Sequence, residues 1–216
     1  MTRTHIPGIL AMAAIVVASN ILVQYLILDG LLTWGAFTYP LAFLVTDVMN
    51  RIYGAPAARK VVLAGFVTGV ICSLIGSQIM LQGDGFEYAA VPLRIAVASG
   101  LAFLVAQLTD ITVFNRFRDG KWWRAPLVST LIGSALDTTI FFTVAFSASI
   151  TLFGADADAA INWAWEGVPF MNAGPVVPLW VTLAFADWLV KLTLALIALV
   201  PFKLIVSKAQ QQTVAI

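Results

Sequence analysis

The sequence predicts an all-α membrane protein, a polytopic bundle of six transmembrane helices with the N and C termini in the cytoplasm. Its 216 residues are 61% hydrophobic and 11% charged, and the mean hydropathy is +0.94. Soluble domains are nearer a quarter charged, so most of this chain must face lipid. At about 20 apolar residues per span, the length allows six spans in a single transmembrane transporter domain, residues 1–216.

The apolar stretches give the predicted spans in chain order. The first, residues 6–28, is expected to be a retained helix, because it is too long for the core of a signal peptide. The second, residues 34–49, is short and contains Pro40 and Asp47, so a broken or partly re-entrant segment is expected. The other spans are predicted at residues 60–80, 93–117, 125–153 and 178–206, each long enough to cross with some tilt.

The positions of the basic residues predict the orientation. Lys and Arg are retained on the cytoplasmic side of a membrane, whereas acidic residues contribute little. Of the 12 Lys and Arg, Arg94 alone falls at the outer face, and Lys191 is inside a span. Six spans produce this alternation, and five or seven would spoil it. The ten residues on the cytoplasmic side are Arg3, Arg51, Arg59, Lys60, Arg116, Arg118, Lys121, Arg124, Lys203 and Lys208.

The sequence lacks the usual signatures of several functional classes. The chain has no P-loop motif, so it cannot itself use ATP by that route. A lone His5 and a lone Cys72 provide no cluster for a metal, and no cofactor is expected. No basic patch indicates a nucleic acid. An intramembrane aspartic enzyme would need Asp110 and Asp137 side by side, and neither has the flanking Gly or preceding Tyr expected of such a protease.

Ionisable residues inside the predicted spans, or at their inner ends, form the functional shortlist. A charged side chain at the bilayer centre costs about 2.5–3.5 kcal/mol even on the mildest scale, so each needs a partner or a use. The five residues are Asp47, Asp110, Asp137, Asp187 and Lys191.

Polar residues three or four positions apart extend this shortlist. Such pairs project from one face of a helix, and together these faces predict a polar pocket inside an apolar shell, the form of a small-molecule site in a bundle. The pairs are Asn20 with Gln24, Asp47 with Asn50, Gln107 with Asp110, and Ser134 with Asp137.

Each feature also has a structural interpretation. Asp187 and Lys191, four apart, could form a helical ion pair that needs no ligand. Asp47 and Asn50 could tie down the inner turn at residues 54–56. For Asp110 and Asp137, in mid-span without a basic residue within one turn, function is favoured.

Two further questions stay open at this point. The tryptophans of the long outer loop, residues 154–177, could cap a cavity or lie in an interfacial belt. Ala14 and Ala18 could bring a second helix close, which leaves a homodimer open.

Residues 39–54, YPLAFLVTDVMNRIYG, followed by ARKV at 58–61, resemble the signature of the queuosine precursor transporters within the vitamin uptake transporter group. Residues 105–110 and 129–141 match further blocks, and Lys191 with Pro201 matches more loosely. The resemblance covers roughly residues 20–202. The chain departs from the pattern in a longer, Trp-rich outer loop and in Arg51, where an acidic residue is expected.

This resemblance implies a transporter, not an enzyme, that imports a 7-deazaguanine, 7-cyano-7-deazaguanine or its aminomethyl relative, across a bacterial inner membrane for tRNA queuosine salvage. A carboxylate can accept the two adjacent N–H groups of a guanine edge, and Phe114, Phe141 or Trp180 could sandwich the ring. The residues expected to bind substrate are Asn20, Asp47, Asn50, Gln107, Asp110, Asp137 and Lys191.

The source of energy is open at this stage. The lipid-embedded chain could use an ion gradient, with Asp137 or Lys191 carrying a proton. The family also resembles the substrate-binding subunits of energy-coupling-factor importers, which work with a separate ATPase, and that alternative stays open.

Overall fold

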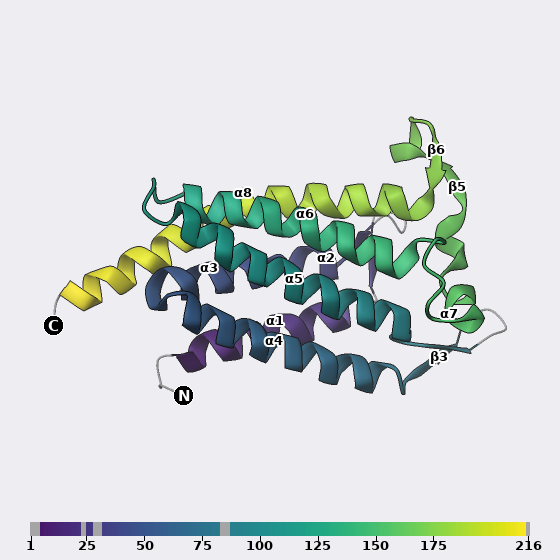
Figure 1. Cartoon of the computed structure of the whole chain (residues 1–216), viewed down its shortest axis with the longest axis horizontal. Coiled ribbons are helices and arrows are strands. Elements are labelled where there is room, and N and C mark those ends of the chain that lie inside the picture. Colours follow the sequence, from purple (N-terminus) through teal and green to yellow (C-terminus); the bar gives the residue numbers. More distant parts are fainter. Residues whose placement is uncertain (1–4, 23–24, 28–31, 83–86, 215–216) are drawn as a thin grey trace.

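The computed structural model of the chain describes residues 5–22, 25–27, 32–82 and 87–214. Five long helices run side by side along one bundle (Figure 1): α1 (Ile6–Leu22), α4 (Ala55–Gly76), α5 (Leu93–Phe117), α6 (Arg124–Phe146) and α8 (Leu179–Val214). Both ends of the described chain lie at the same end of this bundle. Gln24, predicted to share a face with Asn20, lies outside the described residues.

The second predicted span is broken, as its sequence indicates. It divides into α2 (Gly35–Thr38) and α3 (Leu41–Tyr53), with Tyr39 and Pro40 between them. Pro40 has no backbone N–H to donate, so the α2 helix cannot continue through it with a complete hydrogen-bond ladder. Gly54, at φ +83°, then makes the turn between α3 and α4, a backbone conformation that only glycine adopts at little cost.

Several helix ends differ from the predicted spans. Helix α4 covers residues 55–76 instead of 60–80, because the helix begins directly at the Gly54 turn and extends through the basic residues that a hydropathy boundary excludes. Helix α6 ends at Phe146, where Ser147 turns extended, and not at 153. Helix α8 continues through Pro201 to Val214, eight residues past 206, and its end leaves the bundle (Figure 1).

Short β-hairpins that the sequence did not predict lie at the end of the bundle opposite the termini, in a chain that is otherwise mostly helical. They pair β1 (Leu26–Ile27) with β2 (Leu32–Thr33), β3 (Met80–Gln82) with β4 (Glu87–Ala89), and β5 (Gly167–Pro169) with β6 (Val176–Pro178). All are antiparallel and only two or three residues long, so they shape connections between helices and do not form a layer of the fold.

Four of the described helices, α4, α5, α6 and α8, are long and apolar enough to cross a membrane. Helix α1 is apolar but has 17 residues, and α2 and α3 divide the second stretch. Most of the large hydrophobic side chains exposed on the bundle are aliphatic, and on α4 the exposed Leu63, Val67 and Leu74 follow helical spacing. Such a surface suits lipid. That α1 and the α2–α3 pair also cross, giving six spans, stays a prediction.

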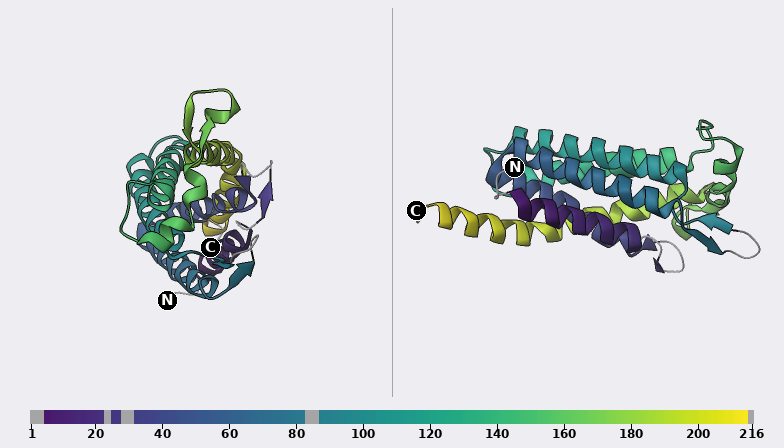
Figure 2. Two further views of the ribbon diagram at one scale, coloured as in Figure 1. Left: turned by 90° about the vertical axis from the view of Figure 1, so that its right-hand side faces the viewer. Right: turned by 90° about the horizontal axis from the view of Figure 1, so that it is seen from below.

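The connection between α6 and α8 covers the helix ends. It holds α7 (Ala155–Ala159) and two 3₁₀ turns, η2 (Asn162–Trp165) and η3 (Phe170–Asn172). Seen along the bundle axis (Figure 2, left), this green segment lies over the helix ends, while the β5–β6 hairpin projects away. The buried Arg94 anchors it, because its guanidinium donates to Asp158 at 2.6 Å and to the carbonyls of Val144 and Ser147. Arg94, the exception to the predicted cytoplasmic placement of basic residues, is thus paired with Asp158.

Helices α1 and α4 approach closely at Gly65. A Cβ atom there would lie 2.6 Å from Cγ of Met12 and 3.0 Å from Cζ of Phe103. One turn further along α4, a Cβ at Gly69 would meet its nearest neighbour, Val16, at an ordinary 3.5 Å. Ala14, the small residue that suggested a helix interface, is exposed.

We expect Gly65→Ala to lower the free energy of unfolding by about 1–3 kcal/mol, because the added methyl group overpacks the α1–α4 contact. Gly69→Ala, the matched control, should be neutral or stabilising by up to about 1 kcal/mol through helix propensity. Thermal unfolding of both variants in detergent measures the difference. Equal midpoints would contradict the close contact.

Candidate functional site

A cavity of about 370 Å³ lies in the half of the bundle that carries the hairpins. This volume is within the range of about 300–1,000 Å³ typical of small-molecule pockets. Residues of α1, α2, α4, α5, α6, η2 and α8 line it, so it collects side chains from most of the chain.

Three charged side chains meet at this cavity. The ammonium of Lys191 lies 2.7 Å from Oδ2 of Asp137 and 2.5 Å from Oδ2 of Asp187. Asp187 and Lys191 come from successive turns of α8, and Asp137 comes from α6. The helical ion pair considered from the sequence therefore exists, and Asp137 makes it a cluster of three.

Neutral hydroxyl groups complete the cluster. The Tyr39 hydroxyl donates to Oδ1 of Asp137 at 3.1 Å, and Nζ of Lys191 lies 5.7 Å from the centre of the Tyr39 ring. Thr138 accepts a hydrogen bond from Lys191 at 3.0 Å and donates to Asp187 at 2.8 Å. Tyr39 lies at the break between α2 and α3.

The formal charge of the cluster is −1, from two carboxylates and one ammonium. Asp137 and Lys191 are 3% and 4% exposed, so water screens them little. Burying charge is expensive unless it is paired, and one negative charge here has no counterpart of its own. The cluster can therefore accept hydrogen bonds from a ligand rich in N–H groups, or from a cationic ligand.

Small polar residues add further hydrogen-bonding groups to the cavity wall. Ser19 and Asn20 of α1 line it, together with Ser73 and Ser99. The amide nitrogen of Asn20 donates to the Val16 carbonyl of its own helix at 2.8 Å. Its amide oxygen is thus the group that can accept a hydrogen bond from a ligand.

Aromatic rings form another part of the wall. Phe141, Phe142, Phe146 and Trp163 line the cavity, and the Phe146 and Trp163 rings pack edge to face at 5.7 Å. Trp165 donates from Nε1 to the Phe146 carbonyl at 2.7 Å, which fixes η2 to the end of α6. The connection between α6 and α8 therefore contributes to the cavity wall, which favours the cap interpretation of its tryptophans.

Of the three rings suggested as sandwich partners, only Phe141 lines this cavity. Phe114 is fully buried away from this cavity, where its ring packs against Phe202 and lies beneath Arg51. Trp180 packs in the apolar cluster of α6 and η2. Sequence alone cannot distinguish these fates, because all three are aromatic residues in apolar helices.

The remaining predicted site residues form a second group, away from the cavity. Asp47, Asn50, Gln107 and Asp110 are all at most 2% exposed and lie where α3, α5 and α6 meet. We call them the inner polar group. Hydrogen bonds from Thr46 to Gln107 (2.6 Å) and from Ser129 and Thr130 to the two Asp47 oxygens (3.2 Å each) hold it.

Asn50 has a structural position in this group. Its amide nitrogen donates to the Ile111 carbonyl, and its amide oxygen and backbone carbonyl both accept from Arg118. Arg51 in turn donates to the Arg118 carbonyl at 2.8 Å. These bonds tie the end of α3 to the end of α5, close to the turn at residues 54–56.

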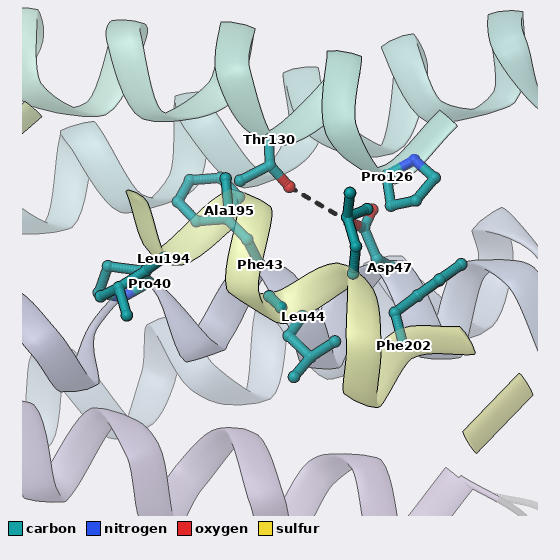
Figure 3. A pocket seen from close by; sticks show the side chains of 11 residues that line it. Pro40, Phe43, Leu44, Asp47, Pro126, Thr130, Leu194, Ala195 and Phe202 are labelled. Atoms are coloured by element: carbon teal, nitrogen blue, oxygen red, sulfur yellow. Dashed lines mark hydrogen bonds between the residues drawn. The ribbon is translucent and has the colours of Figure 1, made fainter. Parts of the chain in front are cut away.

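A second, much smaller cavity lies beside Asp47 (Figure 3). Its volume of about 10 Å³ is roughly enough for one water molecule. Figure 3 shows Asp47 pointing toward Thr130 and Pro126 of α6, with Leu194, Ala195 and Phe202 of α8 on the other side. Asp47 thus faces α8 as well as α5 and α6.

The structure therefore divides the seven predicted site residues. Asn20, Asp137 and Lys191 line the large cavity, and the other four belong to the inner polar group. Tyr39, Thr138 and Asp187 complete the cavity cluster but were not among the predicted substrate contacts. Asp187 was on the shortlist as an intramembrane charge, and Tyr39 begins the block that carries the family resemblance, so both had a signal. Within the described residues, no group of three His, Cys, Asp or Glu could hold a metal ion.

The chain belongs to the vitamin uptake transporter family: a family model described as "Putative vitamin uptake transporter" matches residues 33–206. This membership agrees with the predicted transport protein of several membrane helices. No solved structure matches the chain.

Named relatives narrow the comparison. The chain is 39% identical to the "Queuosine precursor transporter" of Escherichia coli, over 66% of this chain and 68% of that protein. It is 38% identical to the "Probable queuosine precursor transporter" of Haemophilus influenzae, over 78% of this chain and 66% of that protein. A Bacillus subtilis protein of the same name is 32% identical over 53% of this chain and 56% of its own length.

We expect Lys191→Met to destabilise the protein by about 3–5 kcal/mol, because it leaves two buried carboxylates without their cation. The double variant Asp137→Asn with Lys191→Met should recover part of that loss, since it removes one of the stranded charges. Thermal unfolding in detergent measures both. A single variant as stable as the wild type, or a double variant less stable than the single one, would contradict the role of the cluster.

Proposed function

We propose that this chain imports queuosine precursors, small 7-deazaguanines, across the inner membrane of a bacterium for tRNA queuosine salvage. The observation that carries the proposal is the large cavity with the surplus carboxylate of Asp137 and Asp187. The names of three relatives support the substrate class. In the proposed orientation both termini are cytoplasmic and the cavity lies in the outer half of the membrane, where an importer collects its substrate.

The chemistry of the cavity suits a 7-deazaguanine. The guanine edge presents two adjacent N–H donors, and a carboxylate has about four acceptor positions. In the protein, Asp137 accepts one bond from Tyr39 and one from Lys191, which leaves capacity for this edge. The amide oxygen of Asn20 can accept from another N–H group. The rings of Phe141 and Trp163 offer faces and edges on which a flat heterocycle can pack.

We expect Asp137→Asn to weaken binding of 7-cyano-7-deazaguanine by about 1.5–3 kcal/mol, as for a charged hydrogen bond lost from a buried site. This is roughly a 10- to 150-fold rise in Kd. Calorimetry on the purified protein in detergent measures it. Asp119→Asn, the same substitution on the exposed loop between α5 and α6, is the control and should bind like the wild type. A folded wild type that does not bind would overturn the substrate assignment.

The net charge of the cluster also predicts a preference between precursors. An aminomethyl group carries a positive charge that would balance the net charge of −1 on the cavity cluster. The aminomethyl precursor should therefore bind several-fold more tightly than the cyano precursor. The ratio of the two Kd values should shrink in Asp137→Asn, which makes the cluster neutral. A ratio that is the same in both proteins would contradict this role of the charge.

Reconstitution distinguishes a complete transporter from the alternative, a substrate-binding subunit of an ATP-driven importer. Liposomes that contain this chain alone should take up labelled 7-cyano-7-deazaguanine if it is a complete transporter. Uptake only after a partner ATPase and ATP are supplied would favour the subunit.

A further inference from the structure

The inner polar group contains two carboxyl groups that the proposed substrate site does not use. Asp47 on α3 is 2% exposed and Asp110 on α5 is fully buried, and the two carboxyl groups interact electrostatically. Neither carboxylate forms an ion pair with Lys, Arg or His among the described residues. Two acids thus meet in a buried site without a cation between them.

The available donors do not satisfy both acids. The hydroxyls of Ser129 and Thr130 each donate to one oxygen of Asp47. Both oxygens of Asp110 are buried and, in the described part of the chain, receive no hydrogen bond from a donor group. A carboxylate is only an acceptor, so a hydrogen bond between Asp47 and Asp110 requires that one of them carry a proton.

The charged groups on the surrounding helices have other partners, except that Nη2 of Arg51 is buried without a hydrogen-bond partner among the described residues. Arg51, one turn further along α3, interacts electrostatically with Asp47, but it donates to the Arg118 carbonyl and lies 5.0 Å from the centre of the Phe114 ring. Arg118 itself binds Asn50. Arg124 of α6 lies over Phe117, and Lys203 of α8 over Trp122. None of these cations forms an ion pair with Asp47 or Asp110 within the described ranges, so a proton can balance part of the charge of the two acids.

The pair is also joined to the substrate cavity through the chain. Tyr39 binds Asp137 at the large cavity, and the next residue, Pro40, lines the small cavity beside Asp47. On α8, Lys191 holds the charge cluster, and Leu194, three residues later, lines that same small cavity. A change in the protonation of Asp47 can therefore affect the segment of Tyr39 and Pro40 and helix α8, which both contribute residues to the cavity cluster. The small cavity has room for roughly one water molecule, through which a proton could reach Asp47.

We propose that Asp47 and Asp110 form the proton-binding site that couples substrate uptake to an inward proton gradient. This coupling role rests on the proposed import function. A proton from the outer side bonds to a carboxylate oxygen of the pair, and on the inner side the same O–H bond breaks and releases the proton to the cytoplasm.

The first test needs no substrate. Infrared spectra of the purified protein near neutral pH should contain the carbonyl-stretching band of a protonated, buried carboxyl group. Asp110→Asn and, separately, Asp47→Asn should each remove this band, and Asp119→Asn should keep it. Absence of the band in the wild type, or its survival in both variants, would overturn the shared proton. Two variants protect the test against the failure of one to fold.

The second test measures coupling in liposomes that are acidic outside. Wild type and Asp119→Asn should accumulate labelled 7-cyano-7-deazaguanine above equilibrium, and Asp110→Asn should only equilibrate it. Exchange of labelled for unlabelled substrate by Asp110→Asn, which needs substrate binding but no proton gradient, should stay within about twofold of the wild type. Accumulation by Asp110→Asn, or accumulation by the wild type driven by sodium and not by protons, would overturn the proposal. Absence of any uptake or exchange by the wild type would instead overturn the import function, which the infrared band does not depend on.

Discussion

The absence of water from the membrane interior is the constraint on which the rest of this structure depends. Every polar group in the bundle needs a partner there, because an unpaired charge in hydrocarbon costs several kcal/mol. Lys191 forms ion pairs with both Asp137 and Asp187, so each of these three charges has a partner, and the contact joins α6 to α8. It also leaves one negative charge beside a cavity, so the interaction that stabilises the bundle is the one that prepares it for a ligand.

The break between α2 and α3 lies next to both polar groups of the bundle. Tyr39 and Pro40 lie at this break, where Tyr39 donates to Asp137 and Pro40 lines the cavity beside Asp47. The two polar groups of the bundle therefore share one short, irregular element and one long helix, α8. An incomplete hydrogen-bond ladder at membrane depth is tolerated where protein surrounds it or where it lines a cavity, and this segment does both.

Composition, span order and the intramembrane charges could be predicted from the sequence, because apolar length and the cost of buried charge are local properties. The broken second segment was predictable from Pro40. The helix ends were not, since Gly54 and Ser147 set them through backbone geometry that hydropathy does not record. Helical spacing placed Gln107 with Asp110 correctly on one face, but it could not tell that this face meets Asp47 while Asp137 meets Lys191. These partners are 54 and 63 residues apart in the chain, so their contact depends on how helices pack, and a single sequence leaves that open.

The central claim, that the large cavity binds the substrate, is tested most directly by protecting a cysteine within it. Cys72 is the one native cysteine, so Cys72→Ser with Ser99→Cys places a single thiol in the cavity wall. Its rate of reaction with a maleimide is measured with and without 7-cyano-7-deazaguanine, beside the control Cys72→Ser with Asp119→Cys on the exposed loop between α5 and α6. We expect the substrate to slow the labelling of Ser99→Cys and leave the control unchanged. Equal labelling of Ser99→Cys with and without bound substrate would contradict the account.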